Sequence, residues 1–276
     1  MPLELTYTLS SKLPVEIDGI VPNALSDLTL PEIERLQVQH GNGRLALADA
    51  FKIGGGAADE HLRFSGDLSG VHRIGAGMTS GRIDVVGSVG RHAGSQMVGG
   101  ELHISGDAGD WLGAEMRGGS ILVRGDAGNR AGAAYPGSER GMTGGAIAVA
   151  GNVGDECGHT MRRGLIAVGG NCGDFAGINM IAGSLVVFGE CGARVGAAMR
   201  RGTIALLGPW PPRLLPTFRP SCRLRPIALA LLLREIRRLG LPAAPELGQA
   251  EYWLYHGDSL TIGRGEIWSR EQPVEA

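Results

Sequence analysis

The chain has 276 residues, of which 26 are basic and 28 acidic, and its formal net charge is −2. This near balance predicts no nucleic-acid or polyanion binding from net charge alone. No signal peptide is evident, and the longest apolar run, Ile227 to Leu233, is far shorter than the ~20 residues that cross a bilayer. We therefore expect a cytoplasmic protein without membrane contact.

The first 60 residues do not follow the pattern of the rest of the chain. Leu3 to Leu9 alternates like a strand, and Pro31 to Leu36 predicts one helical turn. The chain that follows is repetitive, and a stack of repeats needs atypical sequence at its open end. Residues 1–60 are thus expected to form an N-terminal cap.

From residue 82 onward one unit returns at a fixed period. Each unit opens with a short alternating apolar run that ends in glycine. The closing glycines are Gly87, Gly106, Gly125, Gly151, Gly170, Gly189 and Gly208. They recur every 19 residues except for one gap of 26, and an earlier unit ends at Gly66. A period of this size indicates a solenoid.

The residue types within a unit predict strands rather than helices. Two apolar residues per run share one face, as Ile83 and Val85 do, because side chains alternate along a strand. The second half reads Gly-x-x-x-Gly-x-x-Met-x-x-Gly, and a helix with so many glycines would lose about 1 kcal/mol at each. We predict an all-β chain whose 19-residue rungs form a right-handed parallel β-helix over residues 61–208, with a Met column in its core.

The 26-residue unit holds an insertion over residues 133–141, after which Met142 resumes the register. An insertion in one repeat becomes a loop on one face of the stack, often a binding face. A contact role and a tolerated surface loop are both open at this point.

Residues 209–276 are expected to form a C-terminal part packed on the β-helix. The outward positions are polar in early rungs (Asp84, His103) and apolar in late ones, and an apolar face must be covered. After a Pro-rich linker, a helix over 227–239 would supply that cover; a partner subunit is the alternative. The face predicted to be buried consists of Ile227, Leu231, Leu232, Ile236 and Leu239. A hairpin turning at residues 256–258 is expected to follow.

Candidate sites are few. Cys157, Cys172 and Cys191 fall at inward positions that favour small buried side chains, and His92, His103 and His159 lie at three different repeat positions. No metal site and no catalytic residue is predicted. The non-structural candidate is a basic column between the Met of a unit and its closing Gly: Arg117, Arg162, Arg163, Arg200 and Arg201. Stacking would align these guanidinium groups for a chain of carboxylates or an acidic partner. The alternative is a solvated edge that discourages strand pairing.

The repeat Gly-(Asp/Asn)-x-Gly-x-x-x-Gly-x-x-Met-x-x-Gly-x-Ile-x-Val resembles that of the C subunits of formylmethanofuran dehydrogenases. Those subunits are similar to the C-terminal β-helix domain of the glutamate synthase large subunit. Residues outside the repeat support the resemblance: Pro31-Glu-Ile33, Gly41-Asn42, Phe51, Gly257-Asp258 and Gly263-Arg-Gly265. It covers roughly residues 30–208 and 252–267. The wider first unit, the insertion at 133–141 and the Pro-rich linker at 209–225 depart from it.

The resemblance implies a subunit of a one-carbon enzyme complex. The archaeal complexes reduce CO2 to formylmethanofuran. A bacterial relative in methylotrophs, the formyltransferase/hydrolase complex, passes formyl from tetrahydromethanopterin to a methanofuran-type carrier and releases formate during formaldehyde oxidation. Metal centres and catalytic residues lie on other subunits, so this chain is expected to bind no cofactor tightly.

We expect a non-catalytic scaffold subunit of the formyltransferase/hydrolase complex. Its partners would be amidohydrolase-like, dehydrogenase-B-like and formyltransferase subunits. If the carrier has an oligoglutamate tail, the basic column would guide it. The alternatives are the C subunit of a tungsten or molybdenum formylmethanofuran dehydrogenase and, from another class, a stand-alone β-helical enzyme.

Overall fold

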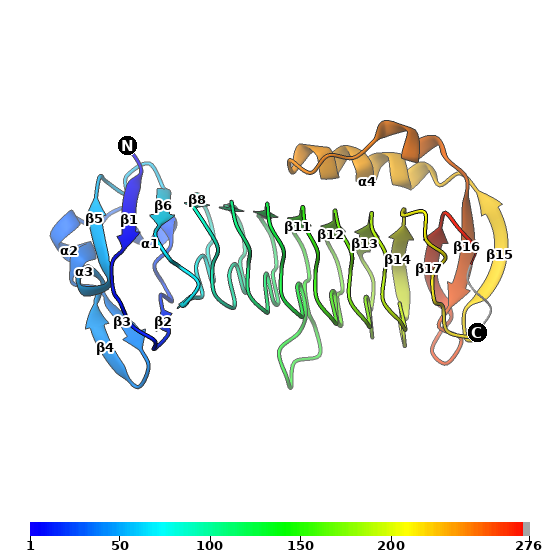
Figure 1. The fold of residues 1–276 in the computed structure, drawn as a ribbon, viewed down its shortest axis with the longest axis horizontal. Helices are drawn as coiled ribbons and strands as arrows, with labels where there is room; N and C mark the ends of the chain where they lie inside the picture. The colour runs from blue at the N-terminus through cyan, green and yellow to red at the C-terminus, as the bar shows by residue number, and fades with distance from the viewer. Residues whose placement is uncertain (273–276) are drawn as a thin grey trace.

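The computed structural model describes residues 1–272. The molecule is elongated, and its strands stand side by side along the long axis, with the N-terminal elements at one end and the last strands at the other (Figure 1). The chain is rich in strands and poor in helices, as expected for the all-β class. No helix within the described residues is both long and apolar enough to cross a membrane.

The N-terminal elements build one end of the rod. They are β1 (Leu3–Tyr7), β2 (Val15–Glu16), α1 (Pro22–Leu25), α2 (Leu30–Glu34), β3 (Gln37–His40), β4 (Gly43–Ala46), α3 (Leu47–Ala50) and β5 (Phe51–Gly54). β1 pairs antiparallel with β5 and parallel with the first rung strand, so this segment is joined to the main sheet. The strand predicted over Leu3 to Leu9 is present but ends at Tyr7, and the helical turn near Pro31 is confirmed as α2. The Glu32 carboxylate accepts a hydrogen bond from the Thr29 backbone N–H at 2.8 Å.

Each rung contributes one strand to a 13-stranded sheet. These strands are β6 (His61–Ser65), β8 (Arg82–Val85), β9 (Glu101–Ile104), β10 (Ser120–Val123), β11 (Ala146–Val149), β12 (Leu165–Val168), β13 (Ser184–Val187) and β14 (Arg201–Leu206). Neighbours are parallel and equivalent repeat positions face each other, as Ile83 faces Leu102. The short β7 (Val71–His72) belongs instead to a four-stranded sheet with β2, β3 and β4.

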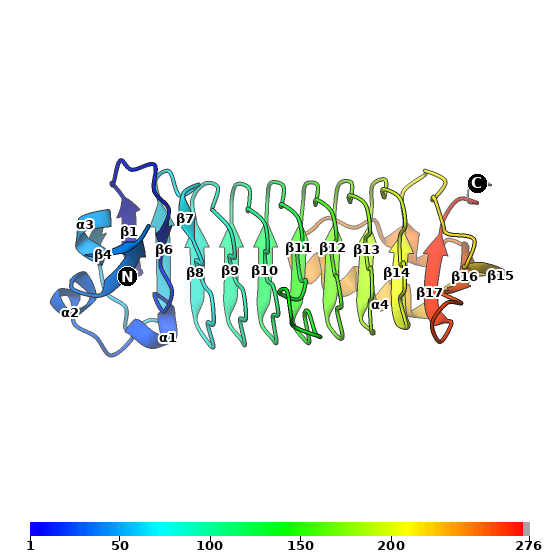
Figure 2. The same ribbon diagram turned by 90° about the horizontal axis from the view of Figure 1, so that it is seen from below.

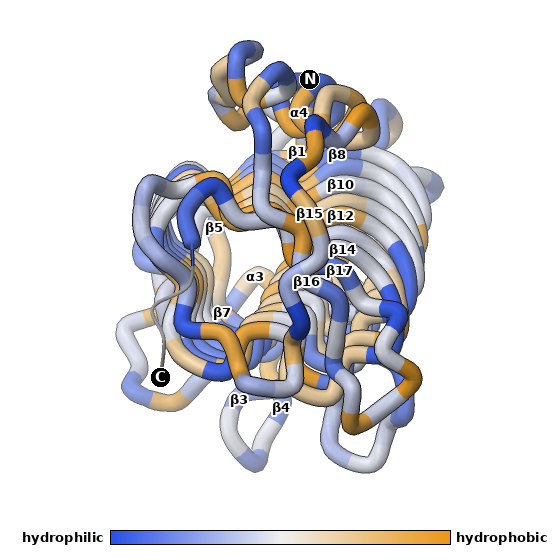
Figure 3. Tube along the Cα trace, turned by 90° about the vertical axis from the view of Figure 1, so that its right-hand side faces the viewer, coloured by the Kyte–Doolittle hydropathy of each residue, from blue (hydrophilic) through white to orange (hydrophobic). Residues whose placement is uncertain are grey.

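A second parallel ladder runs beside the sheet. Its single-residue bridges join Leu68, Val89, Ala108, Ala127, Val153, Cys172 and Cys191. Seen from a second side, the strands and loops of successive rungs repeat at regular intervals (Figure 2), and along the axis the rungs superpose (Figure 3). The methionine column belongs to the hydrophobic core, and every member from Met97 to Met199 is fully buried. Cys157, Cys172 and Cys191 are buried free thiols, as predicted.

The corners after each strand are held by side-chain amides and carboxylates. Asp107 Oδ1 accepts a hydrogen bond from the Asp126 backbone N–H at 2.8 Å, and Asn152 and Asn171 do the same for the following rungs. A second column behaves alike: Asp155 Oδ1 accepts from the Asp174 backbone N–H at 2.8 Å. These Asx residues therefore satisfy backbone donors of the next rung.

The apolar outer face of the late rungs is covered by α4 (Ile227–Arg238), which lies along that side of the rod in Figure 1. This confirms cover from within the chain. The predicted helix face is partly wrong. Leu229, Leu233 and Ile236 are buried against Ala148, Ala167 and Val186 of the sheet, together with Leu239, whereas Ile227 and Leu231 are 86% and 66% exposed. The helix is rotated from the predicted orientation, and Arg124 Nη1 donates to the Gly240 carbonyl beyond its end at 2.8 Å.

The C-terminal segment closes the sheet. The predicted hairpin is formed by β16 (Tyr252–Gly257) and β17 (Arg264–Ser269), which pair antiparallel. Its turn was predicted too early, because His256 and Gly257 still pair with β17 and the connection covers residues 258–263. β17 continues the parallel ladder on β14. The Pro-rich stretch predicted as a linker contains a further strand, β15 (Arg219–Leu224), paired with β16. Between the helix and the hairpin lies the 3₁₀ helix η1 (Pro245–Gln249). Buried aromatic side chains of the hairpin, Tyr252 and Trp268, join the cluster under α4, which explains why this strand pair is fixed there.

Candidate functional site: a basic groove and a polar network

The residues that directly follow the methionines are stacked along one edge of the rod, and each is hydrogen-bonded through its backbone N–H to the preceding rung. The backbone N–H of Arg162 donates to Met142 O, that of Ile181 to Met161 O and that of Arg200 to Met180 O, each at 2.8 Å. Arg162 and Arg200 are therefore separated by one intervening rung, which corresponds to roughly 10 Å between their backbones. The residues one step later, Arg163, Ala182 and Arg201, stand where earlier rungs carry glycine.

The four late arginines surround one groove. A cavity of about 820 Å³ is lined by Arg162, Arg163, Arg200 and Arg201, with Ile181 and Ala182 between them and the β16–β17 loop at its end. All four arginines are exposed. Within residues 1–272 none of them forms an ion pair, so their charges remain available to a ligand.

Arg117 does not join this groove. It occupies the same repeat position two rungs before Arg162, and Thr143 stands between them. The predicted basic column is therefore interrupted at Thr143 and Ile181, and the structure gathers four of its five members. The interruption is readable in the sequence once the rungs are aligned.

The loop between β16 and β17 is fixed against the last rung. The Asp258 carboxylate accepts hydrogen bonds from the backbone N–H groups of Ala198 at 3.0 Å and Leu260 at 2.9 Å. Thr261 Oγ1 donates to the Met199 carbonyl at 2.7 Å. Burial opposes ionisation of Asp258, but these backbone donors outweigh it and lower the pKa of the carboxyl group. Leu260 and Ile262 consequently stand at the groove with 80% and 52% exposure.

The insertion over 133–141 packs on neighbouring rungs and also reaches the groove. The Tyr135 ring lies 5.0 Å from that of Trp111 and 5.5 Å from that of His92, and its hydroxyl is 2.9 Å from His92 Nδ1. Burial raises the pKa of Tyr135 and lowers that of His92. At its far end, Glu139 and Arg140 line a cavity of about 490 Å³ together with Arg162 and Arg200. Arg140 was missed by the sequence analysis because it belongs to no repeat position.

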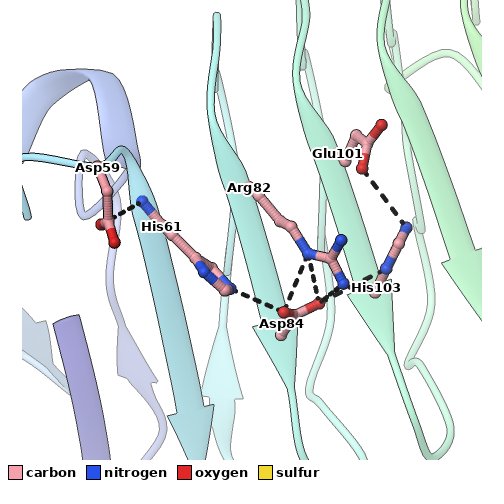
Figure 4. A network of polar contacts seen from close by, with 6 residues as sticks. All are labelled: Asp59, His61, Arg82, Asp84, Glu101 and His103. Carbon is pink, nitrogen blue, oxygen red and sulfur yellow. Dashed lines mark hydrogen bonds and ion pairs between the residues drawn. The ribbon is translucent and has the colours of Figure 1, made fainter. Parts of the chain in front are cut away.

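A separate polar network lies on β6, β8 and β9 in the early rungs (Figure 4), whereas α4 lies over later rungs (Figure 1). Asp84 Oδ2 is 2.7 Å from His61 Nε2, and Asp84 Oδ1 is 2.9 Å from Arg82 Nη2 and 3.5 Å from His103 Nδ1. These residues come from β6, β8 and β9, whose register places Arg82 opposite His61 and His103 opposite Asp84. The network was missed because His61 lies in the first, irregular unit.

This network is built to hold a carboxylate ionised. Burial would raise the pKa of Asp84, but hydrogen bonds from Arg82 and His61 outweigh it and lower that pKa. Burial, followed by the charge of Arg82, lowers the pKa of His103. A carboxylate saturated by donors is a weak proton acceptor, so the arrangement suits a surface ion network rather than general base catalysis. Within residues 1–272 no group of three His, Cys, Asp or Glu side chains is placed to hold a metal ion.

No family model matches the chain. Curated proteins match it in part, among them three C subunits of formylmethanofuran dehydrogenases. That of the molybdenum-containing enzyme 1 of Methanothermobacter thermautotrophicus is 42% identical over 84 residues, which is 30% of this chain and 21% of that protein. That of the tungsten-containing enzyme 2 of the same organism is 38% identical over 95 residues, 33% of this chain and 35% of the relative. That of the molybdenum-containing enzyme 1 of Methanosarcina barkeri is 38% identical over 82 residues, 28% of this chain and 27% of the relative. The matches thus span between a fifth and about a third of these relatives.

A solved structure matches along the whole chain. It is a chain in the crystal structure of the formyltransferase/hydrolase complex from Methylorubrum extorquens in complex with methylofuran. The TM-score is 0.88 and the sequence identity 33%, over 99% of this chain and 100% of that one. This match spans the N-terminal elements, the rungs and the C-terminal hairpin together. The chain belongs to the family of the C subunits of formyltransferase/hydrolase complexes and formylmethanofuran dehydrogenases.

Proposed function

We propose that the chain is a non-catalytic scaffold subunit of a formyltransferase/hydrolase complex. That complex would transfer formyl from formyl-tetrahydromethanopterin to a methanofuran-type carrier and release formate in one-carbon oxidation. The observation that carries this proposal is the full-length match to a chain of the Methylorubrum extorquens complex, which contains methylofuran. The saturated Asp84 network is consistent with a subunit that leaves the chemistry to its partners.

We propose that the partners are amidohydrolase-like, dehydrogenase-B-like and formyltransferase subunits. A rod with an irregular cap at one end and a hairpin at the other offers separate surfaces to several partners (Figure 1). The same subunit in a molybdenum or tungsten formylmethanofuran dehydrogenase is the second candidate, and the partial matches to the C subunits of both enzyme types favour it.

We further propose that the rungs form a right-handed parallel β-helix, with a cap over residues 1–60, repeats over 61–208 and a C-terminal part over 209–276, of which 273–276 lie outside the described residues. The parallel sheet, the second bridge ladder and the buried methionine column support this architecture. β1 and β17 extend the sheet at its two ends, and its edge strands are β5 and β15.

The basic groove is proposed to hold the oligoglutamate tail of the carrier. Guanidinium groups bind carboxylates in a bidentate manner, and four of them with no ion-pair partner among residues 1–272 face one cavity. Arg117 would extend the track toward the N-terminal end. Replacing Arg162, Arg163, Arg200 and Arg201 by Gln is expected to raise the KM for the polyglutamylated carrier without preventing assembly. An unchanged KM would contradict the track.

Native mass spectrometry of the protein purified at low salt from its own organism tests the subunit assignment. Co-purifying transferase and amidohydrolase-like subunits without a metal-pterin cofactor would support the formyltransferase/hydrolase complex. A molybdenum- or tungsten-pterin in the assembly would instead assign the chain to a formylmethanofuran dehydrogenase. A stable oligomer of this chain alone would overturn both.

A further inference from the structure

We propose that the insertion over residues 133–141 is the second wall of the basic groove, and that Arg140 is a fifth cation for the acidic tail. This inference rests on the proposed tail site and extends it to a segment outside the repeat. It assigns the insertion a binding role, the alternative to a tolerated surface loop.

Two cavities meet to make one groove. The cavity of about 490 Å³ beside the insertion and the cavity of about 820 Å³ beside the β16–β17 loop share Arg162, Ile181, Arg200 and Thr261. Arg140 lines only the first of these cavities, and Arg163 and Arg201 line only the second. A chain crossing the shared row would therefore pass from Arg140 to Arg163 and Arg201 without leaving charged surface.

The insertion is fixed where it approaches the groove. The backbone N–H of Gly141, next to Arg140, donates to the Thr160 carbonyl at 3.1 Å, and that of Ala134 donates to the His159 carbonyl at 3.3 Å. At the other side the Tyr135 backbone N–H donates to Glu115 Oε1 at 3.3 Å, and its ring packs on Trp111. Both ends of the loop are thus anchored on rungs, while the Arg140 side chain is exposed.

The chemistry of the groove fits a chain of glutamates. The groove is lined by five guanidinium groups and by a single carboxylate, that of Glu139, so its net charge attracts a polyanion. The groove also has apolar lining, with Ile181 between the arginines and Leu260 in the loop at its end, and these side chains can contact the methylene groups that separate successive carboxylates. The roughly 10 Å between Arg162 and Arg200 is spanned by about three residues of an extended peptide, so several carboxylates can engage at once.

Replacing Glu139 tests the proposal in the opposite direction, because this change should strengthen binding of the acidic tail. Glu139 lies in the same loop and lines the same cavity as Arg140, but its charge repels a carboxylate. In the assembled complex, binding of a fluorescent deca-glutamate would be measured by anisotropy at low salt. Arg140→Gln is expected to weaken binding roughly two- to fivefold and Glu139→Gln to strengthen it by a similar factor, the size typical of exposed charge pairs. Arg44→Gln, in β4 at the far end of the rod, is the matched control and should leave binding unchanged.

The outcomes separate this inference from the tail site on which it rests. If the Arg140→Gln variant binds as the wild type does, while the variant with Arg162, Arg163, Arg200 and Arg201 all changed to Gln does not bind, the insertion has no role and the tail site stands. If both variants bind as the wild type does, the role of the insertion and the tail site are both overturned. Equal weakening by Arg44→Gln would show a nonspecific charge effect and also overturn the inference. Native mass spectrometry of each variant confirms that the complex is assembled before binding is compared.

Discussion

Replacing Leu233 by Ala tests how α4 is attached to the rod. Leu233 is 1% exposed and packs in the cluster between the helix and the outer face of the late rungs. The change removes about three buried carbons at roughly 0.8 kcal/mol each and leaves a cavity, so the expected cost is about 3 kcal/mol. For a chain of this size that corresponds to a fall in Tm of roughly 6–12 °C if unfolding is cooperative.

The matched control is Leu231→Ala on the same helix. Leu231 is 66% exposed, so its truncation is expected to change stability by less than about 0.5 kcal/mol. Both substitutions put Ala, a good helix former, in the helix interior, so the difference between them reports packing. Thermal unfolding followed by circular dichroism measures both variants. Equal destabilisation by the two changes would refute the orientation of α4 described above.

Three further predictions concern pH, the corners and the thiols. Burial is the main cause that lowers the pKa values of His72, His92, His103 and His159 in the folded chain. Below about pH 6.5 the unfolded chain therefore binds more protons, so Tm should fall as the pH drops from about 7 to 5, and a constant Tm would contradict this. Asn171→Ala removes the acceptor of the Glu190 backbone N–H and should cost about 0.5–1.5 kcal/mol in urea unfolding, whereas Asn171→Asp should stay close to wild type. Of the four free thiols, only the exposed Cys222 should react promptly with Ellman's reagent in the folded protein, and prompt reaction of a second thiol would show that the core opens.

The strands of the rungs could be predicted because each repeat position carries the same physical restriction in every unit. Gly87, Met97 and Ile83 each occupy a position where the backbone, the core or the sheet accepts few alternatives, and the period exposes that restriction many times over. The Asx side chains at the corners were not predictable in the same way, because they bond to the next rung, and that contact depends on stacking rather than on local sequence.

The orientation of α4 could not be read from the sequence. Its first seven residues, Ile227 to Leu233, are all apolar, so periodicity selects no face there. The choice is made by the fit of Leu229 and Leu233 to the small outward residues of the sheet, and Ile227 is left exposed. The strand β15 was missed because its pairing with β16 is nonlocal and its own residues are mostly exposed.

The basic groove was only partly predictable. Alignment of the rungs placed Arg162 and Arg200 at one repeat position, and the structure puts both at one cavity. Arg140 depends on how the insertion folds back, which no period describes. The contact of His61 with Asp84 depends on the first irregular unit taking the register of the later ones. In each case the missing information was tertiary.

Because the rungs are stacked regularly, the length of the molecule is set by the number of rungs. Each rung advances the rod by one strand spacing of about 4.8 Å, and its hydrogen bonds reach only the rungs on either side. Gain or loss of one 19-residue unit would therefore shift the cap relative to the β16–β17 loop by that single step, with little change to either end. Subunits bound at the two ends would be held at a separation set by the number of repeats, and that separation could be adjusted in uniform increments.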